Sequence, residues 1–125
     1  GTMILSSREL DVMNVLWERG SATVSEVLEA IPDDLAYTTV LTILRRLEKK
    51  GHVGHETEGK AHRYMAHVQR EEAQDSALQR VTRKLFGGSQ ELLMSRLLRR
   101  GTLTEEQLRE LRAMVDERLG EGGGS

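Results

Sequence analysis

The 125-residue sequence contains no cysteine, a single proline and very few aromatic residues. The lack of cysteine excludes disulfides, thiolate catalysis and cysteine-based metal sensing, and it fits a reducing compartment. With one Trp, two Tyr and one Phe, any core must be mainly aliphatic. No apolar run reaches the length of about 18 residues that a membrane span needs. We therefore expect a cytoplasmic protein without membrane insertion.

Motifs of the common catalytic sites are also missing. There is no Gly-rich phosphate loop, no HExxH pattern and no Ser beside a plausible base, so we expect no enzyme activity and no cofactor. Four histidines lie close together in the sequence: His52, His55, His62 and His67. No cysteine or paired carboxylates accompany them, so we expect surface or phosphate-contacting histidines rather than a metal site.

The segment 36–51, AYTTVLTILRRLEKKG, combines an apolar helical face with a small polar face and a basic end. The apolar positions that recur at helical spacing and should be buried are Val40, Ile43, Leu44 and Leu47. Thr38, Thr39 and Thr42 are short enough to let a helix approach base edges. The cations that follow, long enough to reach phosphates, are Arg45, Arg46, Lys49 and Lys50. The pattern predicts a DNA-recognition helix, with an ordinary amphipathic helix as the alternative.

After Gly51 the apolar periodicity changes from about 3.6 to 2. Residues 52–56 and 61–65 predict two strands, joined by a turn over 57–60. The tip and the return strand contain Lys60, His62 and Arg63, which would contact phosphates. A helix followed at once by a hairpin is the order of a winged helix-turn-helix, whereas the alternative is a plain surface hairpin.

The chain before residue 36 predicts two more helices. Ser6 to Glu9 is a capping-box pattern that begins a helix over 7–19. The apolar face of that helix is predicted at Leu10, Met13, Leu16 and Trp17. A second capping box, Thr23 to Glu26, begins a short helix that Pro32 stops. Residues 5–67 therefore predict a winged helix-turn-helix DNA-binding domain of three helices and a hairpin.

Residues 68–119 predict three further helices, over about 69–86, 89–99 and 104–119, so the protein is expected to be mainly α. About fifty residues in three helices cannot bury the apolar stripes that these helices present. We expect a homodimer held by this dimerisation domain, with a monomer folded back on itself as the alternative. The expected dimerisation residues are Leu78, Val81, Leu85, Phe86, Leu92, Leu93, Leu97, Leu98, Leu108, Leu111, Met114 and Val115.

The two ends of the sequence are expected to lie outside these domains. Residues 120–125, GEGGGS, predict a flexible tail because the segment is rich in glycine. Gly1 and Thr2, before Met3, are expected to be an expression scar.

The net charge of −2 is distributed unevenly. Residues 37–63 contain six Lys/Arg and three Asp/Glu, or +3, whereas residues 1–36 contain two and seven, or −5. Local field matters more for DNA docking than total charge. The distribution predicts modest non-specific affinity and a strong dependence of DNA binding on dimerisation.

Several motifs, in this order along the chain, resemble the BlaI/MecI/CopY family of bacterial repressors. The matching segments are Leu10 to Met13 with Leu16-Trp17, Leu35 to Leu44, Arg46-Leu47, Lys50-Gly51, Gly59 to Tyr64, Leu85 to Ser89 and Leu92-Leu93. The resemblance spans roughly residues 5–119. It implies a dimeric winged-helix repressor of genes for β-lactam resistance or other stress responses, bound to a palindromic operator with inverted TACA/TGTA-type half-sites. The expected DNA-binding residues are Tyr37, Thr38, Thr39, Thr42, Arg45, Arg46, Lys60, His62 and Arg63.

The resemblance also implies how such a repressor is released. Well-known members are cleaved in the dimerisation domain, under the control of a membrane-bound sensor metalloprotease, at an Asn-Phe bond. Arg96-Leu97 stands at the aligned position, so the cleavage site, the inducer and the regulated genes stay open. The copper-responsive branch is excluded because it needs cysteine pairs. Two alternatives remain, a winged-helix repressor released by direct small-ligand binding and a winged helix that binds protein.

Overall fold

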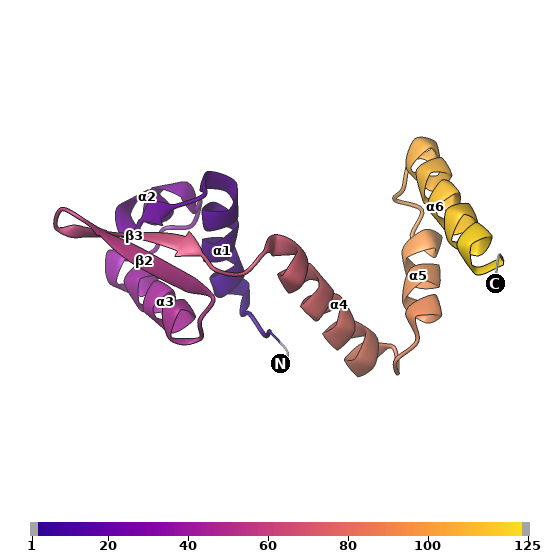
Figure 1. Cartoon of the computed structure of the whole chain (residues 1–125), viewed down its shortest axis with the longest axis horizontal. Coiled ribbons are helices and arrows are strands. Elements are labelled where there is room, and N and C mark those ends of the chain that lie inside the picture. The colour runs from indigo at the N-terminus through magenta and orange to yellow at the C-terminus, as the bar shows by residue number, and fades with distance from the viewer. Residues whose placement is uncertain (1–2, 124–125) are drawn as a thin grey trace. The chain divides into compact units, whose positions relative to one another are not determined.

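The computed structural model describes residues 3–123 and is mainly helical, as predicted. Its elements are α1 (Ser7–Arg19), β1 (Ala22–Thr23), α2 (Val24–Ala30), α3 (Tyr37–Lys49), β2 (Val53–Glu58), β3 (Ala61–Ala66), α4 (Arg70–Leu85), α5 (Gln90–Arg99) and α6 (Glu105–Gly123). Two compact units divide between Arg80 and Val81. The first unit contains α1 to α3 and all three strands, and the second contains α5 and α6 (Figure 1). No helix among the described residues is long and apolar enough to cross a membrane.

Reciprocal side-chain caps begin α1 and α2. Ser6 Oγ accepts a hydrogen bond from the Glu9 N–H at 3.1 Å, and Glu9 Oε1 accepts one from the Ser6 N–H at 2.8 Å. Thr23 and Glu26 repeat this arrangement at 3.2 and 2.8 Å. Both capping boxes are confirmed, and each satisfies first-turn N–H groups that a helix cannot bond internally.

The core of the first unit is mainly aliphatic, with Tyr64 as an aromatic member, and is formed by α1, α2, α3 and the strands. Its most deeply buried side chains are Val12, Met13, Leu16, Val27, Val40, Leu44, Leu47, Val53 and Tyr64. The predicted inward face of α3 is confirmed, since Ile43 is buried with its three apolar neighbours. The predicted face of α1 was partly wrong, because Leu10 is exposed while Val12 and Val15 are buried. Helix α1 contacts α2, α3, β1 and β3. These elements bury a wider face of α1 than the apolar repeat that the sequence analysis started at Leu10.

The hairpin belongs to a three-stranded antiparallel sheet in the order β1-β3-β2. Strand β1 has two residues, and Ala22 and Thr23 pair with Tyr64 and Arg63. The sequence did not predict β1, because two residues show no periodicity. The turn predicted over 57–60 was too long, because Thr57 and Glu58 belong to β2 and pair with His62 and Ala61. The hairpin closes through a two-residue loop, and Gly59 in this loop has a φ of 62°. A positive φ at the first loop position is the geometry of a type II′ turn, which glycine adopts at little cost.

The first half of α4 packs as part of the winged-helix unit. Trp17 Nε1 donates a hydrogen bond to the Val68 carbonyl at 2.9 Å, and the Arg70 guanidinium lies 5.5 Å from the centre of the Trp17 ring. The Met3 N–H bonds to Ser76 Oγ at 2.9 Å, and Ala73 is buried. The first compact unit therefore ends at Arg80, and it contains the whole segment 5–67 that is predicted to be the DNA-binding domain.

The C-terminal unit leaves its apolar side chains exposed. No residue of α5 is buried. The exposed members of the expected dimerisation set are Leu78, Val81, Leu85, Leu92, Leu97, Leu98, Leu108, Leu111, Met114 and Val115. Phe86 and Leu93 are half-buried, and Met94 is a further exposed apolar residue that the sequence stripes omitted.

Helix α6 extends further than the sequence predicted. It ends at Gly123, so residues 120–123, expected to be tail, are helical. Arg118 and Glu121 form an ion pair of 3.8 Å across this extension. Glycine alone did not stop the helix, because its cost of about 1 kcal/mol per residue leaves helix formation possible. The expected scar at Gly1 and Thr2 and the end of the expected tail at Gly124 and Ser125 lie outside the described residues.

Candidate nucleic-acid interface

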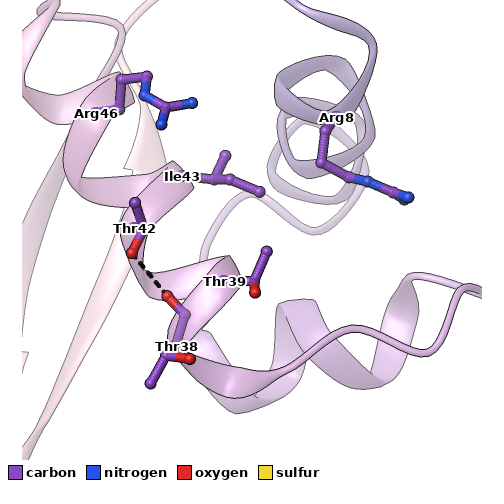
Figure 2. Close-up of a pocket in the computed structure, with 6 residues that line it drawn as sticks. All are labelled: Arg8, Thr38, Thr39, Thr42, Ile43 and Arg46. Atoms are coloured by element: carbon purple, nitrogen blue, oxygen red, sulfur yellow. Dashed lines mark hydrogen bonds between the residues drawn. The ribbon is translucent and has the colours of Figure 1, made fainter.

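Three threonines form the exposed polar face of α3. Thr38, Thr39 and Thr42 line an open depression together with Ile43, Arg46 and Arg8 of α1 (Figure 2). Thr42 Oγ1 donates a hydrogen bond to the Thr38 carbonyl at 2.8 Å. This bond engages the hydroxyl proton, so the Thr42 oxygen is left to accept bonds from groups outside the helix.

Three cations of α3 and one of the hairpin loop have no side-chain ion pair or hydrogen bond within the part of the chain that the structure describes. They are Arg45, Arg46, Lys49 and Lys60. The first three belong to α3 and its last turns, and Lys60 lies in the hairpin loop. Because no carboxylate neutralises them, these side chains give α3 and the hairpin loop their positive potential.

Two other cations of the predicted basic surface are paired with carboxylates. Lys50 Nζ lies 2.9 Å from Glu9 Oε2. Arg63 lies 3.0 Å from both Glu26 and Glu58, and hydrogen bonding to Glu58, followed by the charge of Glu26, raises its pKa. The structure therefore places Arg63, expected as a phosphate contact, inside an ion-pair network.

Arg8 belongs to the α3 depression and was missed by the sequence interpretation. Its guanidinium lies 2.6 Å from Asp33 and 3.0 Å from Asp11, and hydrogen bonding to Asp33 is the main reason that its pKa is raised. Arg8 is far from the threonines in the sequence, and only the packing of α1 against α3 brings it to them. No local pattern in the sequence gives that proximity.

On the wing, His62 stacks against a second histidine. The rings of His55 and His62 are 4.2 Å apart and nearly parallel, and Tyr64 lies 5.5 Å from His55. His55 Nδ1 lies 2.5 Å from a carboxylate oxygen of Glu48 on α3. His67 instead covers Gly54, where an added Cβ would lie 2.2 Å from its ring. Among the described residues no three potential ligands are placed to hold a metal ion.

The side of α3 that faces the wing has mixed charge. Burial raises the pKa of Tyr64, and the nearby charge of Glu48 adds to this effect while that of Arg45 opposes it.

Tyr37, at the first position of α3, is half exposed. The N-cap residue of α3 is Ala36, which provides no side-chain cap, in contrast to the N-cap residues of α1 and α2. Among the described residues, no side chain caps the first N–H groups of α3.

Comparison with known proteins agrees with this geometry. The family model described as "Penicillinase repressor" matches residues 5–117. The methicillin resistance regulatory protein MecI of Staphylococcus aureus strain N315 is 24% identical over 119 residues, which cover 94% of this chain and 97% of MecI. The penicillinase repressor of Bacillus licheniformis is 25% identical over 115 residues, which cover 90% of each chain.

Solved structures give the same result for the fold. The DNA-binding domain of the repressor BlaI has a TM-score of 0.51 at 31% identity, covering 54% of this chain and 85% of that domain. A MarR family protein from Bacillus stearothermophilus has a TM-score of 0.55 at 14% identity and covers 97% of this chain and 77% of its own, a likeness of fold alone. The chain belongs to the penicillinase repressor family, whose members are DNA-binding transcriptional repressors and not enzymes.

Proposed function

We propose that this repressor acts as a homodimer that reads a palindromic operator through α3. The observation that supports it best is the threonine face of α3, which is exposed and bordered by Arg46, a cation without an ion pair among the described residues. Thr38, Thr39 and Thr42 are proposed to contact base edges and thymine methyl groups. Small side chains at these positions allow the close approach that base reading in the major groove requires.

Phosphate contacts are proposed for the cations around that face. Arg45 and Arg46 of α3 and Lys60 of the wing have no carboxylate partner within the described residues. Such contacts fix the position of a protein on the duplex without reading its sequence. Tyr37, beside the uncapped start of α3, and His62, exposed on the wing, are proposed to lie at the edges of the same interface.

The C-terminal unit is proposed to supply the dimer contact. Leucines occupy exposed positions on the end of α4, on α5 and on α6. Exposed apolar side chains in this number are unusual for a monomer surface and favour a protein partner. A second copy of the chain is the simplest partner, because a two-fold dimer places two recognition helices on the two halves of a palindrome.

The biological role is proposed from the relatives. One is named a methicillin resistance regulatory protein and another a penicillinase repressor. By that relationship the chain would act in the cytoplasm on genes for β-lactam resistance or another stress response, at inverted TACA/TGTA-type half-sites. Release by proteolysis in the C-terminal unit, with a membrane-bound sensor metalloprotease as partner, is part of the same proposal. Arg96-Leu97 occupies the position of the expected cleavage site.

Release by a small ligand is less well supported. A ligand-sensing repressor needs an enclosed, mostly apolar pocket with a few converging polar groups. The depression at α3 is open to solvent, and so is a second one lined by Phe86, Arg96, Arg99 and Arg100. Neither has the enclosure that would retain a small apolar effector.

Fluorescence anisotropy with short duplexes tests the proposed function. The full chain should bind a palindrome of TACA/TGTA half-sites at least about a thousandfold more tightly than a scrambled duplex of equal length, at fixed salt. Equal binding to both duplexes would contradict specific repression, and binding to neither would favour a winged helix that contacts protein instead.

A further inference from the structure

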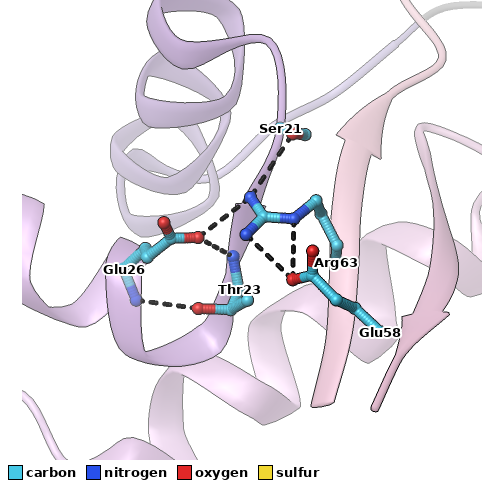
Figure 3. A network of polar contacts seen from close by, with 5 residues as sticks. All are labelled: Ser21, Thr23, Glu26, Glu58 and Arg63. Carbon is cyan, nitrogen blue, oxygen red and sulfur yellow. Dashed lines mark hydrogen bonds and ion pairs between the residues drawn. The ribbon is translucent and has the colours of Figure 1, made fainter.

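Arg63 connects three elements of the winged-helix unit through its guanidinium. Nη1 lies 3.0 Å from Glu26 Oε1 on α2 and 3.5 Å from Ser21 Oγ. Nε and Nη2 each lie 3.0 Å from Glu58 Oε2 at the end of β2 (Figure 3). Arg63 itself belongs to β3, so one side chain joins the start of the helix-turn-helix to both strands of the wing.

One acceptor of Arg63, the Glu26 carboxylate, is held in place by a second bond. Glu26 Oε1 also accepts the Thr23 N–H at 2.8 Å, as part of the capping box of α2. Thr23 pairs with Arg63 across β1 and β3. The Thr23 N–H, followed by the charge of Arg63, lowers the pKa of Glu26. The guanidinium therefore meets a carboxylate that is held in place and ionised at neutral pH.

Charge balance makes Arg63 a poor phosphate contact. Its single positive charge is shared between two carboxylates, Glu26 and Glu58, so the network has a net charge of −1. A DNA phosphate would have to compete with both of them. Lys60, three residues earlier in the hairpin loop, has no such competitor among the described residues.

We infer that Arg63 is a positioning residue, which fixes the wing against α2 so that Lys60 meets the DNA backbone. The inference rests on the proposed DNA-binding function and assigns Arg63 a role different from direct contact. Glu58 is the last residue of β2 and is paired with Ala61, so the ion pair acts directly beside the loop that contains Lys60. The planar guanidinium suits this task because it bonds two acceptors at a fixed angle.

Salt dependence of operator binding separates positioning from direct contact. Lys60→Gln should lower the slope of log K against log salt by about 0.9, the value for one phosphate contact. If Arg63 acts through Lys60, Arg63→Gln in the Lys60→Gln background should lower that slope no further. An additional loss of about 0.9 in the double variant would mean that Arg63 contacts a phosphate itself, which would overturn the inference.

A conservative variant gives a second test. Lysine binds phosphate as a point charge, but it cannot bond Glu26 and Glu58 as a fork does. Arg63→Lys should therefore weaken operator binding as much as Arg63→Gln, by about two- to fivefold, the range for partly exposed ion pairs. Wild-type affinity in Arg63→Lys, with reduced affinity in Arg63→Gln, would favour direct contact and contradict positioning.

A matched pair of glutamates gives opposite expectations for the two roles. Glu58→Gln and Glu56→Gln each remove one negative charge from β2 close to Arg63. Glu56 is the register partner of Arg63 on β3, but of the two glutamates only Glu58 is ion-paired with it. If Arg63 positions the wing, Glu58→Gln should bind the operator more weakly than Glu56→Gln, because only Glu58→Gln removes an ion pair that holds the wing in place. Direct contact predicts the reverse order, because Arg63 would be released toward DNA.

A measurement without DNA keeps this inference separate from the proposed function. Backbone ¹⁵N relaxation of the full chain should show lower order at Gly59 and Lys60 in Arg63→Gln and Arg63→Lys than in Lys60→Gln, with unchanged helical circular dichroism. Unchanged backbone order at Gly59 and Lys60 in the two Arg63 variants would contradict the positioning role of Arg63, whether or not the protein binds DNA. If the wild-type chain bound no DNA, while the Arg63 variants showed the expected loss of order at the wing tip, only the proposed function would be contradicted.

Discussion

Lys50 Nζ lies 2.9 Å from Oε2 of Glu9, so the C-cap residue of α3 is ion-paired to the first turn of α1. The Glu9 side chain is only 3% exposed. Burial is the largest influence on this group and opposes its ionisation. The Ser6 N–H and the Lys50 ammonium together outweigh burial, and they lower the pKa of Glu9.

We predict that Glu9→Gln destabilises the fold at neutral pH. The amide still accepts a bond from the Ser6 N–H but loses the attraction of Lys50, so the free energy of unfolding should fall by about 1–2 kcal/mol. Because folding lowers this pKa, the contribution is complete above the unfolded value of about 4.3 and is lost as pH falls through the folded value. Urea unfolding at pH 7 and in steps below about pH 5 measures both effects.

The comparison variant is Glu29→Gln, an exposed position of α2 without a described partner. It should change stability little at any pH. Two results would contradict this role of Glu9. One is a difference in the free energy of unfolding between wild type and Glu9→Gln that stays constant on acidification. The other is a difference at pH 7 no larger than that caused by Glu29→Gln.

Local signals in the sequence predicted most of the winged-helix unit. The capping boxes at Ser6 and Thr23 each depend on residues three apart, and both helices begin where these patterns place them. The inward face of α3 and the hairpin also follow from short-range periodicity. These features need no knowledge of tertiary packing, because the groups that determine them are neighbours in the chain.

Features that depend on distant partners could not be predicted in the same way. The pairing of Arg63 with Glu26 joins residues far apart in the sequence, so the basic residue was interpreted as a free phosphate contact. Arg8 reaches the α3 depression only through helix packing. Which face of α1 is buried depends on the elements that pack against it, so the hydrophobic pattern alone did not show that Leu10 is exposed.

Base reading by α3 gives a second prediction. Thr39→Ala or Thr42→Ala should reduce discrimination between operator and random DNA by about 1–3 kcal/mol, because a base contact is lost. Arg46→Ala should weaken binding to both DNAs alike, since phosphates are the same in each. Anisotropy titrations on the two duplexes at one salt concentration measure these differences. An equal loss on both DNAs for all three variants would remove the threonines from base reading.

Thr42 permits a finer version of this test. Thr42→Val keeps the branched shape but removes the hydroxyl that donates to the Thr38 carbonyl. If the methyl group reads thymine, Thr42→Val should retain most of the discrimination that Thr42→Ala loses. Discrimination lost equally in both variants would assign the reading to the hydroxyl oxygen.

Assembly gives a third prediction, with a matched control. Leu111 on α6 and Leu10 on α1 have nearly equal exposure, 38% and 37%. Leu111→Glu should raise the dimer dissociation constant by tenfold or more, since about 1.4 kcal/mol or more of apolar burial is lost. Leu10→Glu should leave the dissociation constant unchanged. Sedimentation or light scattering over a concentration series measures both, and a monomeric wild type at micromolar concentration would contradict the dimer.

Truncation gives a fourth prediction, with its boundary taken from the structure. A chain ending at Arg80 retains the buried Ala73 and the Ser76 contact with Met3, so it should stay folded but become monomeric. Its affinity for a palindrome should fall by orders of magnitude, while a single half-site is bound as weakly as before. A chain ending at Gln69 should unfold more readily, because it loses the packing of α4. Tight binding of a palindrome by the 80-residue fragment would contradict the proposal that the C-terminal unit supplies the dimer contact.

Footprinting on the DNA just upstream of the protein's own gene tests the central claim most directly, because it shows both the sequence that is bound and the symmetry of the site. The account predicts two protected half-sites related by a two-fold axis and separated by about a whole number of helical turns. Both should disappear together in a variant with Thr39→Ala and Thr42→Ala. No protection at concentrations that saturate other DNA non-specifically, or a single unpaired site that survives the threonine substitutions, would contradict a dimer that reads its operator through α3.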